Sequence, residues 1–63
     1  MARAYSIWVV TRAHDVMATF TVKHELVSWL KKQAAVPYME VQRFPDGGRG
    51  QPGALVSATT FLA

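Results

Sequence analysis

Residues 5–45 read YSIWVVTRAHDVMATFTVKHELVSWLKKQAAVPYMEVQRFP, and this stretch decides the fold. Two alternating apolar segments are followed by a segment with apolar residues at helical spacing and then by a third alternating segment. This order predicts an α+β domain of the ββαβ type. We expect a three-stranded antiparallel sheet with one helix packed on one of its faces.

The first predicted strand covers residues 4–12 and is rich in the β-branched and aromatic side chains that suit a pleated sheet. Its two faces carry Tyr5, Ile7 and Val9 on one side and Ser6, Trp8 and Val10 on the other. Because both faces are apolar, we expect this strand to be central, which gives the strand order 3-1-2. The helix covers one face, and the other needs a cover from the chain's own tail or from another molecule.

Residues 13–15 predict a hairpin turn, and residues 16–21 predict the second strand. Thr21 has a hydroxyl suited to capping a helix, so the helix is expected to start near Val22. Lys31 and Lys32 oppose the negative end of the helix dipole, and Pro37 prevents the helix from continuing.

The third predicted strand covers residues 38–44 and stops at Pro45. If the alternation is strict, Tyr38 and Phe44 lie on the face of Glu40. The domain is therefore expected to span residues 1–45.

Residues 46–53 contain four glycines and a proline and are interpreted as a flexible linker. The last ten residues, 54–63, are apolar and uncharged. They are compatible with a mobile tail, with a fourth strand on the sheet edge, or with a segment that docks onto a partner.

The chain has 63 residues, of which 51% are hydrophobic, and it has no cysteine. This length allows one small core and argues against a catalytic domain with its own cleft. No apolar run is long enough to span a membrane, and the N-terminus lacks a signal-peptide pattern. We expect a cytoplasmic, non-enzymatic protein without a cofactor. Its net charge of +3 favours acidic partners.

The few residues that could carry catalytic or metal chemistry are scattered. His24-Glu25 resembles the start of a zinc-protease helix motif, but Ser28 stands where the second histidine is needed. We therefore expect neither a metal site nor a catalytic site.

Two kinds of macromolecular partner are compatible with the sequence. Nucleic acid could stack on Trp8 together with Tyr38 or Phe44. The charge for such a site would come from Arg3, Arg12, Arg43 and Arg49. A protein partner could instead pair with the edges of the second and third strands, and an arginine there can bind a carboxylate bidentately. The candidate partner-binding residues are Arg43, Glu40, Gln42, Arg12, Trp8 and Tyr38.

The segment Val36-Pro37-Tyr38 followed by Glu40-Val41-Gln42-Arg43 resembles small phage-encoded host-takeover proteins. The nearest of these are the inhibitors of bacterial RNA polymerase from T-seven-like phages, which have a comparable length and a strand-strand-helix-strand core. The resemblance implies that Arg43 contacts the target. The chain departs from that family at Pro45, which replaces a second arginine, and at Thr11 and Arg12, which replace acidic residues.

The sequence thus predicts a non-catalytic, phage-type protein that binds and inhibits a bacterial host protein in the host cytoplasm, with RNA polymerase as a candidate target. One alternative is a basic nucleic-acid-binding module. Another is a self-assembling structural subunit. The expected oligomeric state is a monomer or a weak homodimer.

Overall fold

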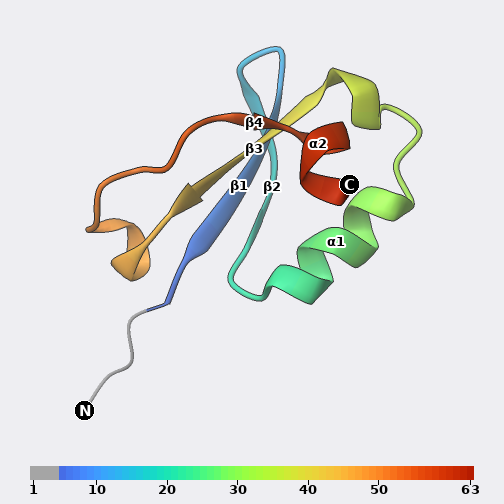
Figure 1. The fold of residues 1–63 in the computed structure, drawn as a ribbon. Coiled ribbons are helices and arrows are strands. Elements are labelled where there is room, and N and C mark those ends of the chain that lie inside the picture. Colours follow the sequence, from blue (N-terminus) through green and yellow to red (C-terminus); the bar gives the residue numbers. More distant parts are fainter. Residues whose placement is uncertain (1–4) are drawn as a thin grey trace.

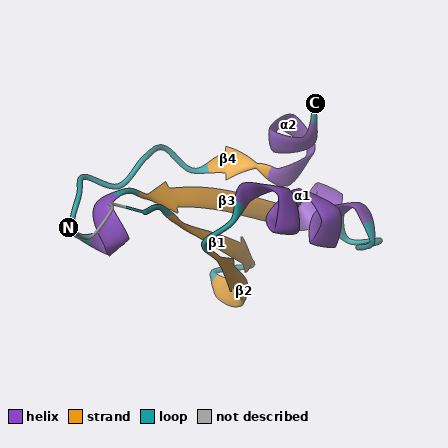
Figure 2. Cartoon of the chain, turned by 90° about the horizontal axis from the view of Figure 1, so that it is seen from below, coloured by secondary structure: helices purple, strands orange, loops and turns teal. Residues whose placement is uncertain are grey.

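A four-stranded antiparallel sheet in the order β2-β1-β3-β4 forms the centre of the molecule (Figures 1 and 2). The computed structural model describes residues 5–63. The elements are β1 (Ile7–Arg12), β2 (Asp15–Phe20), α1 (Lys23–Lys31), the 3-10 turn η1 (Val36–Tyr38), β3 (Met39–Phe44), the 3-10 turn η2 (Asp46–Gly48), β4 (Val56–Ser57) and α2 (Ala58–Leu62). The predicted ββαβ core and the strand order 3-1-2 are confirmed.

The central position of β1 follows from its two apolar faces. Val10 pairs with Ala18 of β2 and with Val41 of β3, and all three side chains lie on the face covered by the helices. One residue earlier in the chain, Val9 lies on the opposite face, because successive side chains of a strand point to opposite sides. We call the covered side the helix face and the opposite side the open face.

The β1–β2 hairpin turns through Ala13 and His14, both of which have positive φ angles, 52° and 70°. Two positive φ values in a two-residue loop are typical of a type I′ turn, whose twist matches that of the strands. Arg12 and Asp15 form the last pair of the ladder. The predicted turn at residues 13–15 is therefore one residue too long.

Helix α1 begins one residue later than predicted. Its N-cap is Val22, which has extended backbone angles and provides no side-chain hydrogen bond, so the prediction of Thr21 as the cap is wrong. At the other end the amides of Lys32 and Gln33 donate to the carbonyls of Trp29 and Leu30. The helix thus ends at Lys31, well before Pro37, which lies inside η1.

Replacing the uncapped Val22 by threonine is expected to stabilise the fold by about 0.5–1 kcal/mol, because the new hydroxyl can accept a hydrogen bond from a first-turn amide. Threonine keeps the shape of valine, so little packing is lost. Urea unfolding followed by circular dichroism measures the change. Val27→Thr is the control: the same exchange inside the helix should destabilise, and equal effects at both positions would contradict the capping explanation.

In the described part of the chain, six side chains are buried in the core between the sheet and the helices. They are Val10, Leu26, Leu30, Met39, Val41 and Ala58. Seven partly buried hydrophobic residues pack around them: Trp8, Phe20, Trp29, Ala35, Val36, Phe61 and Leu62. The core therefore takes residues from the first three strands, from α1 and from the last six residues of the chain.

The C-terminal segment is part of the fold. Val56 and Ser57 pair with Val41 and Glu40, which confirms a fourth strand among the three alternatives for residues 54–63. The Ser57 hydroxyl then accepts a hydrogen bond from the amide of Thr60 at 3.2 Å and starts α2, a helix that the sequence pattern did not predict. In Figure 1, α2 lies next to α1, so the last residues of the chain add to the helix face. The open face instead meets residues 46–53, where the Gln42 side-chain amide donates a hydrogen bond to the carbonyl of Gly53 at 3.0 Å.

Residues 46–53 connect β3 to β4 and are tied to the sheet by hydrogen bonds. The Gly47 amide donates to the carbonyl of Tyr5 at 2.6 Å, and the Gly53 amide donates to the carbonyl of Arg43 at 2.8 Å. Gly47 has a φ of 63°, which glycine adopts without strain. None of the helices between residues 5 and 63 is long and apolar enough to cross a bilayer.

Candidate partner-binding surfaces

The structure distributes the six candidate partner-binding residues over three places. Trp8, Arg12 and Arg43 are on the helix face, since Trp8 pairs with Arg43 and Arg12 with the buried Met39. Glu40 and Gln42 are on the open face, one residue out of phase with buried Met39 and Val41. Tyr38 belongs to η1, ahead of β3.

The prediction that Tyr38 shares the face of Glu40 is wrong, because the strand begins only at Met39. The Tyr38 side chain is 70% exposed, and its ring lies 5.8 Å from the guanidinium carbon of Arg12, within cation–π range. Phe44 is on the Glu40 face as predicted, opposite Ile7. Trp8 and Phe44 therefore lie on opposite faces of the sheet and cannot form one stacking platform.

A shallow cleft on the helix face brings Trp8 and Arg43 together with two residues that the sequence did not single out, Lys23 and Phe61. We call it the Arg43 cleft, and its volume is about 300 Å³. It is lined by Trp8, Lys23, Val41, Arg43, Ala54, Val56 and Phe61. The start of α1, the middle of the sheet and the C-terminal segment thus meet at one site.

The two cations of the Arg43 cleft are held by different elements. Arg43 is exposed, and its Nε donates a hydrogen bond to the Ser6 hydroxyl at 2.7 Å, which orients the guanidinium group. The Lys23 ammonium lies 5.8 Å from the centre of the Phe61 ring. No acidic side chain is among the lining residues of the cleft. The cleft therefore combines an apolar floor with two positive charges at its rim.

Among the described residues, the outer side of β2 is an unpaired edge of the sheet. Both outer strands of the predicted core, β2 and β3, were expected to be edges, but β4 covers part of β3. No strand among residues 5–63 pairs with the outer side of β2. Val16 is 62% exposed and Met17 is 47% exposed, and the ladder with β1 is irregular at this point. Apart from this irregularity, the backbone of β2 is available for pairing with a further strand.

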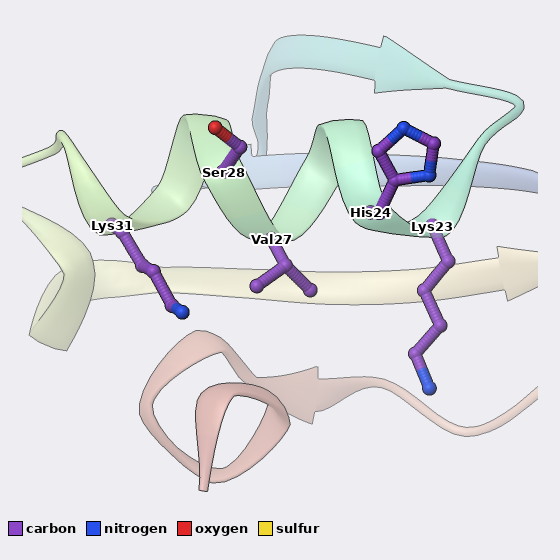
Figure 3. A pocket seen from close by; sticks show the side chains of 5 residues that line it. All are labelled: Lys23, His24, Val27, Ser28 and Lys31. Carbon is purple, nitrogen blue, oxygen red and sulfur yellow. The ribbon is translucent and has the colours of Figure 1, made fainter.

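Two grooves run along α1, and His24 and Ser28 line both of them. Figure 3 shows Lys23, Val27 and Lys31 projecting toward α2, whereas His24 and Ser28 project to the other side. On that other side a groove of about 390 Å³ separates α1 from β2. It is lined by Phe20, His24, Glu25, Ser28, Trp29 and Lys32.

The two histidines lie on different elements. His14 lies in the hairpin and His24 in the first turn of α1. In the part of the chain that the structure describes, no group of three potential ligands is close enough to hold a metal ion. Arg3, one of the four arginines considered for nucleic-acid binding, lies outside the described residues, as does Ala4 of the first predicted strand.

Comparisons of this chain with protein families, with curated proteins and with solved structures found no match.

Proposed function

We propose that this chain is a non-catalytic binding protein that inhibits a bacterial host protein by occupying an acidic region of it with the Arg43 cleft. One observation carries the proposal: Lys23 and Arg43 flank an apolar floor that contains no acidic side chain. An acidic side chain of a partner, followed or preceded by an apolar one, would complement both features.

The chemistry of Arg43 supports a carboxylate as the group recognised. A guanidinium group offers five donors in a planar fork, and only its Nε is used by Ser6. The remaining donors can bind a carboxylate bidentately. Covering the apolar floor of the cleft with a partner would lower the local dielectric constant and strengthen that interaction.

The phage-type origin of the proposal comes from the resemblance of residues 36–43 to inhibitors of bacterial RNA polymerase. Arg43 is the one residue that could take over a target-contacting role from that family, and it lies in the cleft. RNA polymerase is accordingly the first target to test. Inhibition would follow from occupying a surface of the target, since a small binder of this kind needs no chemistry of its own.

Nucleic acid is the competing partner, because the cleft also contains Trp8 and Phe61 beside its cations. A single strand is normally bound along a continuous basic groove with several stacking side chains. Arg12 lies at the end of β1 that is distant from the Arg43 cleft, where it pairs with Met39. Lys31 is likewise two helical turns away from Lys23. The positive charges are thus divided between the two ends of the domain, which favours a compact acidic site on a protein.

The proposal predicts that Arg43→Gln weakens binding to the host target at least about ten-fold, and that adding Lys23→Gln weakens it further. Purified bacterial RNA polymerase is titrated first, and a bacterial lysate is then probed with the immobilised protein and the captured protein identified. The same variants should lose inhibition of the captured target in its own activity assay.

Arg12→Gln is the matched control, because it removes the same charge from the same sheet face outside the cleft. Equal losses for Arg12→Gln and Arg43→Gln would contradict the assignment of the cleft. Capture of nucleic acid alone, with binding that falls steeply as salt concentration rises, would favour the nucleic-acid alternative.

A further inference from the structure

The groove between α1 and β2 lies on the side of the domain where the sheet ends without a partner strand. The ring of Trp29 packs against Phe20, with 5.7 Å between their centroids, and forms the floor of the groove. Its rim is polar and carries Glu25, Ser28 and Lys32. Figure 3 shows that Ser28, in this rim, and the neighbouring His24 project away from α2.

The charges along this rim are self-complementary. Glu25 and Lys32 are seven residues apart, which places them on one side of α1 about 10 Å apart along the axis. Ser28 and Trp29 lie midway between them. A second α1 running antiparallel about that midpoint would set each Glu25 opposite the other copy's Lys32.

The free edge of β2 permits the same symmetry. A two-fold axis perpendicular to the sheet pairs two β2 strands antiparallel and keeps both α1 helices on the same side. Trp29, in the middle of the rim, packs on Phe20, the last residue of β2. The middle of the rim therefore lies level with the C-terminal end of β2, beyond the irregular Val16–Met17 region. One axis can therefore serve both the strand pair and the helix pair.

We propose that the edge of β2 and the Glu25–Lys32 rim of α1 form an isologous interface with a second copy of this chain. The two four-stranded sheets would join into one continuous sheet through residues 18–20 at the end of β2, and Val16 and Met17 would lie outside this strand pair. The complementary charges on the rim are what single out a second copy as the occupant. This interface does not use the Arg43 cleft and does not depend on the proposed function.

The test uses the full chain and measures its mass by light scattering and sedimentation equilibrium at increasing protein concentration and low salt. We expect a monomer–dimer equilibrium. Glu25→Lys and Lys32→Glu should each raise the dimer dissociation constant at least about ten-fold, because each turns two attractive pairs into two repulsive ones. Lys31→Glu is the control, since it makes the same charge change on the side of α1 that faces α2.

Mixing the Glu25→Lys and Lys32→Glu variants gives the decisive measurement. The Glu25→Lys chain carries two lysines on the rim and the Lys32→Glu chain carries two glutamates, so the mixture should form a heterodimer at least as readily as the unmodified chain forms its homodimer. A monomer at every concentration overturns the proposal. So does a dimer that is insensitive to the charge swaps, as exchange of the C-terminal segments would produce, or a mixture that fails to associate.

Discussion

Leu30→Ala is expected to leave most molecules unfolded at room temperature. Leu30 has no exposed surface and is one of the six core side chains that are buried among residues 5–63. Truncating a buried leucine to alanine costs about 2–5 kcal/mol, through lost burial and through the cavity that remains. A domain of this size rarely has more than about 3–5 kcal/mol of stability in total. The substitution therefore removes most or all of the free energy of folding.

Far-ultraviolet circular dichroism and the fluorescence of Trp29, which packs beside this core, report the loss. Lys31→Ala, at the next and exposed position, is the control and should change stability by less than about 0.5 kcal/mol. An unfolding midpoint of Leu30→Ala close to that of the control would show that the core does not depend on this helix contact.

Removing residues 58–63 is expected to have an effect of similar size. The deletion takes Ala58 out of the core, where it has no exposed surface, together with Phe61 and Leu62, which pack against it. It also removes Phe61 from the lining of the Arg43 cleft. The truncated chain should give a poorly dispersed amide NMR spectrum and no cooperative urea transition.

A point substitution separates the loss of packing from the loss of chain length. Ala58→Asp would bury a carboxylate without a partner and should unfold the domain as well. Thr59→Asp makes the same change at the next, exposed position and should be tolerated. A truncated protein with unchanged stability would contradict the role assigned to α2.

The fold of residues 7–44 could be predicted because its signals are local. Alternation of apolar residues indicated β1, β2 and β3, and the apolar spacing of Leu26 and Leu30 indicated α1. Element boundaries were less accurate. Thr21 was a chemically reasonable helix cap, but the hydroxyl is not used and Val22 takes the position through its backbone. Tyr38 continues the β3 pattern in sequence, yet the turn around Pro37 holds it outside the strand.

The last ten residues were the part of the fold that local signals could not decide. A short apolar segment without charge is equally suited to a strand, a helix or a tail. Its structure depends on Val41, which pairs with Val56, and on the space that Ala58 fills beside α1. Both are contacts with residues far away in the chain.

The candidate site residues were chosen from the sequence by residue type, and the pairing of the strands places them in different groups. Trp8 and Arg43 were chosen for different reasons and prove to be cross-strand partners. Lys23 and Phe61 were overlooked because neither has a distinctive sequence context. Lys23 alone could have been noticed, because it lies at the N-terminal end of the predicted helix, where the helix dipole favours an acidic residue.

By itself, the sequence determined the element order, the central position of β1 and the small, cysteine-free character of the domain. These properties follow from side-chain periodicity and composition, which act over a few residues. Only the tertiary structure decided that the tail covers the helix face, that β2 keeps the free edge, and that Lys23, Arg43 and Phe61 meet at one cleft. These outcomes depend on which segments compete for the same buried surface, and that competition is resolved only when the whole chain packs.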